Sequence, residues 1–369
     1  MDSGAPAAAL LEPLYFEALA GFAEDDAVAA FRAFQAIARP LVEGVAPLRA
    51  GRAASDGLLA AARAALVFEA ADAAAARKFF TTLFRPFRVL TGAGRGFLTG
   101  YYEPHVRGSL TRTHDFSAPV LARPPDLTTF AAVEAPPGFD PALTGAQALA
   151  DGSLRPYPER AEIEEAAQNP LLWLADAVEV FLIQVQGSAR VELTNGQVVR
   201  LVYDGRNGQP YTSIGRLLIA SGEIAESEMS LARLKSWLRA NGLGPGGRAR
   251  ELMRRNRSYV FFRVEEGFNP QEGPIGGAGI PLHPLRSIAV DRAIWPYGTP
   301  FWIEAALPRR GEAPAPFRRL MIAHDTGSAI LGPARADLFF GGGDEAGVRA
   351  GAIRHPADFV VLLPAGEPP

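Results

Sequence analysis

Residues 318–343, RRLMIAHDTGSAILGPARADLFFGGG, contain two apolar runs joined by a turn rich in glycine and proline. Short apolar runs bounded by such residues are typical of buried β-strands. The first run ends at Asp325, and Asp337 stands inside the second. A third aspartate, Asp291, follows a similar run in SIAVDRAIWPYGTP, residues 287–300. One aspartate at a strand end is usually a turn former, but three on neighbouring predicted strands indicate a carboxylate site in a β-rich domain.

The segment Asp325-Thr326-Gly327 also matches the active-site loop of aspartic proteases. Those enzymes need two facing loops whose carboxylates share one proton. The other match in this chain is Asp2-Ser3-Gly4, which has no apolar run before it. Proteases that pair two identical chains have much shorter subunits. A protease is therefore not favoured.

The composition is that of an ordinary globular protein, with 369 residues, 48% hydrophobic and 21% charged. This length suffices for one large domain or two ordinary ones. A net charge of -3 gives no broad positive field, so we expect neither nucleic acid nor an anionic membrane as partner. The absence of cysteine excludes disulfides, a thiol nucleophile and a lipidated cysteine on the chain as given. We expect no signal peptide in MDSGAPAAALLEP, which lacks a basic start and an apolar core.

The residue pattern changes along the chain. Residues 12–90 are rich in alanine, and Val28, Phe31, Phe34 and Ile37 lie on one helical stripe. This predicts packed helices without chemistry. From residue 97 onward the pattern is mostly that of strands, with a stretch at about 117–172 that is full of proline and expected to be rich in loops. The sequence therefore predicts a mainly β fold with N-terminal helices, in two domains.

Within the β-rich part, two apolar runs are predicted to be paired strands. They are VEVFLIQVQGSARVEL (178–193) and VVRLVYDG (198–205), with a hairpin turn at Asn195-Gly196. Short helices are predicted in TSIGRLLIASG (212–222) and SLARLKSWLRANG (230–242).

Six motifs in sequence resemble the MltA family of lytic murein transglycosylases. They are GFLTGYYEP (96–104), YPERAEIEEAA (157–167), the segment 181–219, RRNRSYVFFR (254–263), the segment 276–304, and HDTGSAILGPARADLFFGGGDEAGVRAG (324–351). The resemblance covers roughly residues 90–355. It implies a double-psi β-barrel built from residues 1–105 and 256–369 together with the N-terminal helices. Residues 106–255 would be an inserted, β-barrel-like, glycan-binding domain, with a groove between the two.

The resemblance also implies a reaction. Family enzymes cleave the β-1,4 bond between N-acetylmuramic acid and N-acetylglucosamine without water and leave a 1,6-anhydro end. Because the muramyl C6 hydroxyl is the nucleophile, one carboxyl can act first as acid and then as base. By motif position this group is Asp337, which should lie in partly apolar surroundings that raise its pKa. Asp325 would support it, Asp291 would be structural, and Glu103 is the alternative acid.

Several polar and aromatic residues are candidates for binding the glycan. Rings can stack on sugar faces and amides can pair with N-acetyl groups, and the alternative for each residue is a core or solvated position. These candidates are Tyr101, Tyr102, Glu103, Gln184, Gln186, Ser188, Asn207, Thr326 and Gly327. Gln184, Gln186 and Ser188 are expected to share one face of a strand.

The loop departs from the family pattern at two positions. Ser328 replaces a glycine, so the backbone there must suit a residue with a side chain. Leu331 replaces a basic residue, and Arg335 is the candidate to supply the missing charge. Phe339 and Phe340 could form an apolar wall near Asp337.

The resemblance further implies peptidoglycan glycan strands as ligand, no cofactor, and no metal. The five scattered histidines show no ligand spacing. Wall-remodelling proteins are candidate partners, and a monomer is expected. The family is periplasmic and often anchored to the outer membrane. A non-catalytic peptidoglycan-binding protein on the same fold is the alternative function.

Overall fold

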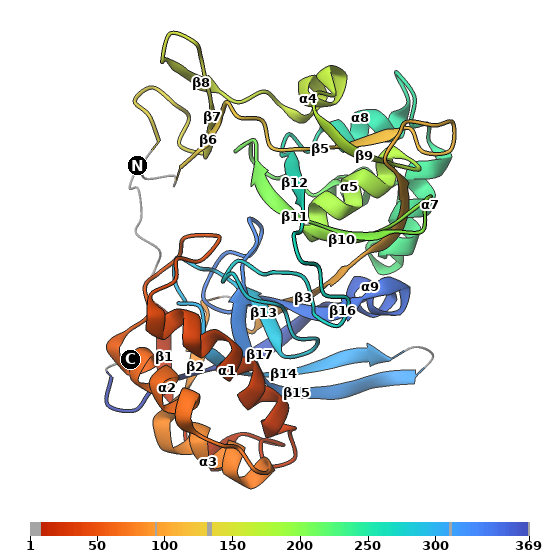
Figure 1. The fold of residues 1–369 in the computed structure, drawn as a ribbon. Helices are drawn as coiled ribbons and strands as arrows, with labels where there is room; N and C mark the ends of the chain where they lie inside the picture. Colours follow the sequence, from red (N-terminus) through yellow and green to blue (C-terminus); the bar gives the residue numbers. More distant parts are fainter. Residues whose placement is uncertain (1–8, 93, 131–134, 310–311, 368–369) are drawn as a thin grey trace. The chain divides into compact units, whose positions relative to one another are not determined.

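The computed structural model describes residues 9–92, 94–130, 135–309 and 312–367, which form two compact units (Figure 1). Unit 1 comprises the described residues of Met1–Tyr102, Gln271–Gly341 and Arg349–Pro369. Unit 2 comprises those of Glu103–Pro270 and Gly342–Val348. The second unit is thus an insertion that divides the sequence of the first.

Three helices form the N-terminal layer of unit 1: α1 (Ala27–Glu43), α2 (Asp56–Val67) and α3 (Ala73–Leu83). Each begins at a side-chain cap, since Asp26, Ser55 and Asp72 accept hydrogen bonds from the first turn. The predicted helices are confirmed. The pattern did not predict the short 3-10 helix η1 (Phe16–Ala18) or the strands β1 (Leu10–Pro13) and β2 (Phe84–Leu90).

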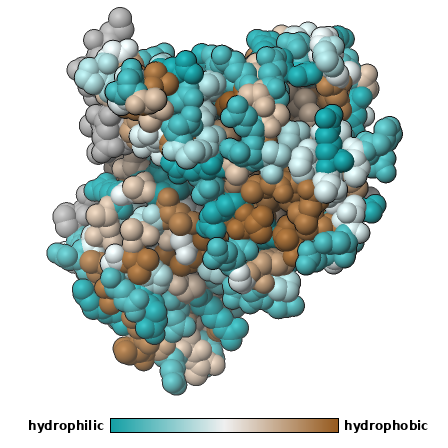
Figure 2. All heavy atoms as spheres, turned by 45° about the horizontal axis from the view of Figure 1, so that its top comes forward, coloured by the Kyte–Doolittle hydropathy of each residue, from teal (hydrophilic) through white to brown (hydrophobic). Residues whose placement is uncertain are grey.

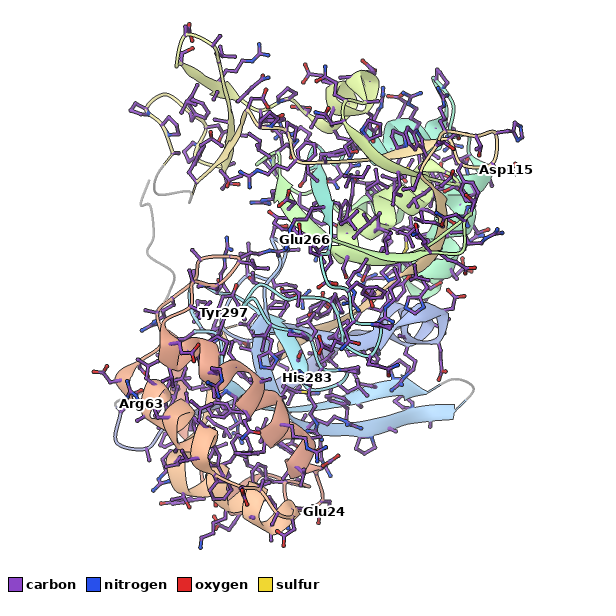
Figure 3. All side chains as sticks on the ribbon, in the orientation of Figure 1. Glu24, Arg63, Asp115, Glu266, His283 and Tyr297 are labelled. Atoms are coloured by element: carbon purple, nitrogen blue, oxygen red, sulfur yellow. The ribbon has the colours of Figure 1, made fainter. Side chains whose placement is uncertain are left out.

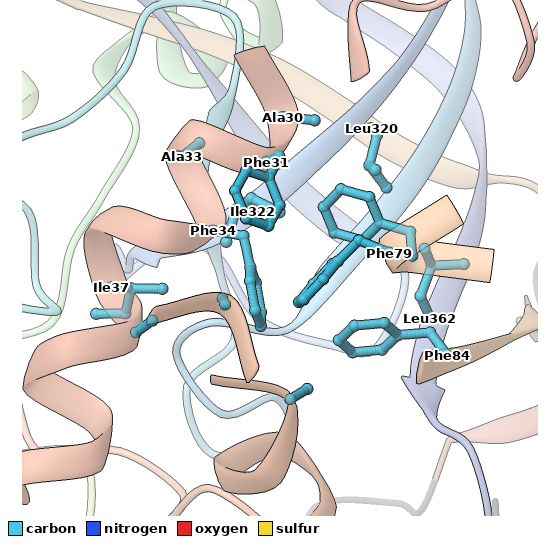
Figure 4. Packing of buried hydrophobic residues seen from close by; sticks show 14 of the residues in the cluster. Ala30, Phe31, Ala33, Phe34, Ile37, Phe79, Phe84, Leu320, Ile322 and Leu362 are labelled. Atoms are coloured by element: carbon cyan, nitrogen blue, oxygen red, sulfur yellow. The ribbon is translucent and has the colours of Figure 1, made fainter. Parts of the chain in front are cut away.

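The apolar stripe of α1 packs into the core of unit 1 (Figure 4). Phe31 and Phe34 meet Phe79 and Phe84 edge-on, with ring centroids 4.9 and 5.7 Å apart for the pairs Phe31–Phe79 and Phe34–Phe84. Full burial of one such ring stabilises the fold by roughly 1.5–3 kcal/mol. The same cluster includes Leu320, Ile322 and Leu362 from the sheet. The helices therefore hold the strand that leads to Asp325.

The sheet of unit 1 closes on itself. Its strand order is β1-β2-β17-β14-β15-β13-β16-β3, and β3 also pairs with β17. Closure thus involves six strands. They are β3 (Gly96–Glu103), β13 (Ser287–Val290), β14 (Pro300–Arg309), β15 (Glu312–Asp325), β16 (Arg335–Gly342) and β17 (Arg354–Pro364). Helix α9 (Gly343–Gly351) follows β16.

Unit 2 is built on a second barrel, with strand order β12-β11-β10-β4-β9-β5. A bridge between Ala122 and Phe262 joins its two ends. The strands are β4 (His105–Ser109), β5 (Ala118–Leu121), β9 (Pro170–Leu174), β10 (Ser188–Leu193), β11 (Val198–Arg206) and β12 (Val260–Val264). A small separate sheet consists of β6 (Leu127–Thr129), β7 (Gly145–Ala148) and β8 (Leu154–Pro156).

Unit 2 also contains several helices. They are α4 (Arg160–Ala166), α5 (Ala177–Gln186), α6 (Ile214–Ala220), α7 (Leu231–Ala240), α8 (Arg248–Arg254) and the 3-10 helix η3 (Glu226–Glu228). The predicted helices α6 and α7 are confirmed. The predicted hairpin is confirmed as well, because β10 and β11 pair antiparallel and Gly196 has a left-handed φ of 83°.

One local prediction was wrong. The run at 178–193 is not one strand, because α5 occupies its first part and ends at Gly187 with a φ of 84°. This helix is apolar on most sides and buried, and such a run cannot be told from a buried strand by periodicity. The stretch 117–172 is rich in loops as predicted, and it also contains the short strands β5 to β8, helix α4 and the start of β9.

The expected fold class is confirmed: mainly β, with N-terminal helices, a closed barrel and a second barrel-like domain. On the face shown in Figure 2, hydrophilic residues cover much of the surface, and hydrophobic residues gather in one larger patch to the right of the centre and in smaller patches elsewhere. No helix in the described part of the chain is long and apolar enough to cross a membrane.

Candidate active site

Strand β13 brings two aspartates into one row of unit 1. Ala289 pairs with Asp337 on antiparallel β16 and with Asp325 on parallel β15. Residues opposite one another on neighbouring strands point to the same face, so the carboxyl groups lie on one side of the sheet with a small alanine between them. The register of β13 against β15 shifts just before this row. Such a bulge re-aims the side chain beside it.

The Asp337 carboxyl accepts a hydrogen bond from Thr99 Oγ1 on β3, at 2.7 Å from its Oδ1. Burial raises the pKa of Asp337 to about 6, and the charge of Asp325 adds to this rise. Arg335 and the Thr99 hydrogen bond lower the same pKa but do not outweigh burial. Asp337 is still partly exposed. The result is a carboxyl that can hold or release a proton near neutral pH.

Asp325 is surrounded by donors. Its Oδ1 accepts from the backbone N–H groups of Gly277 and Thr326, both at 2.8 Å, and its Oδ2 from Tyr101 Oη at 2.9 Å. The oxygens of a carboxylate are hydrogen-bond acceptors, and each of these three groups is a donor. The pKa of Tyr101 is raised well above its usual value, chiefly by burial and then by the nearby Asp325 charge. Tyr101 therefore stays protonated and remains a donor.

The loop after Asp325 is fastened at both ends. Thr326 Oγ1 donates to the carbonyl of Val290 at 2.9 Å, and the Gly332 N–H donates to Asp291 Oδ2 at 2.8 Å. Asp291 Oδ1 also accepts from the Ala293 N–H at 3.0 Å. These bonds tie the loop to the end of β13.

The two departures in this loop are accommodated. Among the described non-glycine residues only Ala167, Asn169 and Leu285 have positive φ, so Ser328 needs no left-handed backbone. Gly332 carries the left-handed turn instead, with a φ of 101°. Leu331 is 71% exposed. Arg335 does not replace a basic residue at that position, because it bonds to Thr99 and stacks on Phe97.

Arg49 is a part of this site that the sequence did not indicate. It lies between α1 and α2, and its guanidinium donates to the Thr326 carbonyl at 2.7 Å. Its backbone N–H donates to Gly277 O at 3.0 Å, and its carbonyl accepts from Tyr297 Oη at 3.0 Å; Figure 3 labels Tyr297. The prediction of helices without chemistry is not affected, because Arg49 lies in the loop between α1 and α2. One arginine in a loop, in a chain with 37 basic residues, gives no distinguishing signal.

Comparison with known proteins places this site in a family. Residues 97–263 match the MltA specific insert domain, and residues 286–363 match the 3D domain. A membrane-bound lytic murein transglycosylase from Agrobacterium tumefaciens has a solved structure that is 34% identical, covers 96% of this chain and 97% of its own, and superposes with a TM-score of 0.85. The chain belongs to the MltA family.

Two further relatives agree. Membrane-bound lytic murein transglycosylase A of Escherichia coli is 32% identical over 72% of this chain, and the alignment spans 65% of that protein's length. The structure of MltA from Neisseria gonorrhoeae is 27% identical, covers 99% of this chain and 94% of its own, and has a TM-score of 0.75. Asp291, Asp325 and Asp337 all fall inside the 3D match, whereas Arg49 lies outside both matched regions.

In this MltA family member the two tyrosines of the TGYYEP motif are buried, at 8% exposure for Tyr101 and 5% for Tyr102. The Tyr101 ring packs on Phe339 with centroids 5.3 Å apart, in a cluster with Leu282 and Ile330. Neither ring offers a free face for stacking on a sugar. Tyr101 contributes its hydroxyl to Asp325 instead. Phe339 is 1% exposed, so it adds to the low-polarity core behind the carboxylates and not to a surface wall.

Glu103 belongs to unit 2 and is only 1% exposed. Its Oε1 lies 2.6 Å from Arg200 Nε and its Oε2 lies 2.7 Å from Arg190 Nε. The Phe268 ring stacks on both guanidinium groups, at 4.5 Å from Arg200 and 5.4 Å from Arg190. Both carboxylate oxygens are thus engaged in charge-assisted hydrogen bonds to arginine. The interpretation of Glu103 as a sugar ligand or alternative acid therefore has no support in this geometry.

The predicted amide face of unit 2 does not form. Gln184 lies in α5, where its carbonyl accepts from Arg160 at 2.7 Å and its amide donates to Val260 O at 3.1 Å. Gln186 is the last residue of α5 and Ser188 is the first of β10, so the three residues do not share a strand face.

Asn207 is fully buried and also serves the fold. Its amide donates to the carbonyls of Pro158 and Arg257, both at 2.9 Å, and its carbonyl accepts from the Tyr259 N–H at 2.9 Å. Its polar atoms are thus used within the protein, so Asn207 does not present its amide to a ligand.

Proposed function

We propose that this chain is a lytic transglycosylase that cleaves the β-1,4 bond between N-acetylmuramic acid and N-acetylglucosamine in peptidoglycan. The names of its relatives favour this substrate and reaction. The observation that carries the proposal is Asp337, a partly exposed carboxyl with a pKa of about 6. It lies in the same row of the sheet as Asp325, whose oxygens accept three hydrogen bonds. Transglycosylation needs one carboxyl that changes protonation state at each step.

In the first step, neutral Asp337 gives its proton to the glycosidic oxygen. The bond between muramyl C1 and that oxygen breaks, and N-acetylglucosamine leaves with a free 4-hydroxyl. Positive charge develops at C1 as the bond lengthens. The fixed negative charge of Asp325, which already acts on Asp337, stabilises that charge.

In the second step, the Asp337 carboxylate takes the proton of the muramyl C6 hydroxyl while O6 bonds to C1. The product is a 1,6-anhydro ring, and Asp337 is neutral again. No water is consumed. Because the nucleophile belongs to the same sugar, it is present at a high effective concentration.

The other residues take their roles from where they lie in the fold. Unit 1 is the catalytic domain. Thr326 and Gly327 belong to the loop that follows Asp325, and Asp291 anchors this loop. Residues 106–255 form a glycan-binding domain whose contacts come from surface groups other than Glu103, Gln184 and Asn207. A periplasmic monomer acting on glycan strands, in company with wall-remodelling proteins, fits the membrane-bound relatives.

Digestion of purified murein sacculi tests the function. The wild-type chain should release muropeptides whose muramic ends lack one water. Asp337→Asn should lower the release by at least about 100-fold, the usual contribution of a general acid, while Asp115→Asn, at an exposed loop position, should not. Release of reducing ends alone would show a hydrolase. Binding of sacculi without any release would show a non-catalytic binding protein.

A further inference from the structure

Three side chains of unit 1 form a directed hydrogen-bond chain that ends on Asp337. Arg335 on β16 donates from its guanidinium to Thr99 Oγ1 at 2.8 Å, and Thr99 on β3 contacts Asp337 Oδ1 at 2.7 Å. The guanidinium is held in turn by the carbonyl of Ala336 and by the Phe97 ring, 5.4 Å away. The Thr99 hydroxyl is therefore bonded on both sides.

The direction of this chain follows from the donor inventory. Arginine has only donors, so it occupies a lone pair of Thr99 Oγ1. The single hydroxyl proton of Thr99 then points to Asp337 Oδ1. Among the described residues the other oxygen, Oδ2, accepts no hydrogen bond. A proton on Oδ1 would compete with the Thr99 proton, whereas a proton on Oδ2 would not.

We propose that Thr99 and Arg335 are positioning residues that keep the proton of neutral Asp337 on Oδ2, the oxygen left free for the glycosidic bond. This inference rests on the proposed function for its catalytic meaning. Thr99 fixes the rotation of the carboxyl, and Arg335 fixes the rotation of the Thr99 hydroxyl. Neither residue transfers a proton to substrate.

The effect of this hydrogen-bond chain can be measured through the pKa of Asp337. Arg335 and Thr99 lower the pKa of Asp337, while burial and Asp325 raise it. Tyr101, which faces the same row from β3, stays neutral because its own pKa is raised. Loss of either positioning residue should therefore raise the pKa of Asp337.

The first test compares Thr99→Val, which keeps the shape but loses the hydroxyl, with Thr99→Ser, which keeps it. With soluble uncrosslinked glycan strands as substrate, Thr99→Val should lower kcat about tenfold, a modest part of a general acid's contribution, at unchanged KM. The upper limb of its pH profile should move to higher pH. Thr99→Ser should restore both. Thr129→Val, at an exposed position of β6, is the matched control.

Arg335→Met tests the hydrogen bond from Arg335 to Thr99. It also tests the inference if the Thr99→Val variant does not fold. It should raise the pKa of Asp337 and lower kcat, whereas Arg88→Met, which breaks an exposed ion pair with Glu12, should do neither. Carbon-13 NMR titration of the Asp337 carboxyl reads the same shift without turnover. If the wild-type protein releases no anhydro-muropeptides, the proposed function fails. The titration still tests the hydrogen-bond chain from Arg335 through Thr99 to Asp337. Unchanged titration, kcat and pH profile in folded Thr99→Val and Arg335→Met would overturn the inference.

Discussion

The Asp337 carboxyl shows how a single residue is tuned by its surroundings. Desolvation favours its neutral form, and the Arg335 charge and Thr99 hydroxyl only partly oppose this. Asp325 and Asp337 lie on opposite sides of Ala289, because this alanine pairs with one aspartate on each neighbouring strand. Asp325 has a more polar environment than Asp337, since its oxygens accept three hydrogen bonds. Two carboxyl groups in different environments can take different roles in one reaction.

The pH profile of lysis should reflect this tuning. The first step needs protonated Asp337, so the initial rate should fall as pH rises through about 6, the raised pKa of this group. The measurement is the rate of anhydro-muropeptide release across pH at constant ionic strength. A rate that keeps rising well above that pH would contradict the assignment of Asp337 as the acid.

The same raised pKa predicts a stability effect. The folded chain binds the Asp337 proton more tightly than the unfolded chain does, so this group lowers the free energy of unfolding as pH rises from its ordinary value toward about 6. Asp337→Asn removes that cost. We expect it to stabilise the fold at neutral pH by about 1–2 kcal/mol, discounted for partial exposure, with no gain at low pH. Urea denaturation at two pH values measures this, and a destabilised variant would contradict it.

At the scale of elements, the loop from Asp325 to Gly332 depends on an anchor outside itself. Asp291, at the end of β13, accepts hydrogen bonds from the Gly332 and Ala293 N–H groups. The bulged register of β13 sets the position of Asp325 at the other end. The loop is therefore positioned by its flanking strands.

Replacing the anchor should loosen the loop. Asp291→Ala leaves two backbone donors without their partner, which should lower the free energy of unfolding by about 1–3 kcal/mol. The rate of lysis should fall with it, because Asp325 and its backbone donors lie on the same loop. Asp115→Ala at an exposed site is the control. An unchanged denaturation midpoint would exclude the anchoring role.

Helix α5 offers a second test at this scale. Gln184 accepts from the buried Arg160, which also donates to Asn256 O and stacks on Phe181 at 4.7 Å. We expect Gln184→Ala to lower the free energy of unfolding by about 1–3 kcal/mol, because a buried guanidinium loses an acceptor. KM for glycan strands should stay the same. A stable variant with a raised KM would restore Gln184 to the glycan-binding residues.

At the scale of the whole molecule, unit 1 is built from separate segments of the chain, so the points where the chain passes from one unit to the other matter for stability. The chain passes from unit 1 to unit 2 at Glu103 and returns after Pro270. Arg190 binds both of these positions within unit 2, through Glu103 Oε2 at 2.7 Å and the Pro270 carbonyl at 2.8 Å. Arg190 therefore ties the start of the inserted segment Glu103–Pro270 to its end.

Breaking this cluster should weaken unit 2 selectively. Glu103→Gln removes the ion pairs that Glu103 makes with the buried Arg200 and with Arg190, and such losses cost about 3–5 kcal/mol. Hydrogen exchange should speed up in β10 and β11 and stay slow in β14 and β15. The control is Glu192→Gln, an exposed position on β10. Equal acceleration in both units would show that they unfold together.

Much of the fold could be predicted because its signals are local. The stripe Val28–Phe31–Phe34–Ile37 indicates a helix, and Asn195-Gly196 indicates a hairpin, since each depends on neighbours in sequence. The sequence failed at α5, where an apolar run buried on most sides has no readable period. It failed at Gln184 and Asn207 because polarity alone does not tell a ligand-binding group from one satisfied inside the core.

The sequence by itself determined that three aspartates lie in or directly beside predicted strands, that the chain is mainly β, and that it resembles the MltA family. Only the tertiary structure decided which groups meet. The pairing of Ala289 with both Asp325 and Asp337, the reach of Arg49 to the Thr326 carbonyl, and the chain from Arg335 through Thr99 all join distant segments. Strand register and barrel closure set such contacts, and these depend on the packing of the whole unit and not on local preference.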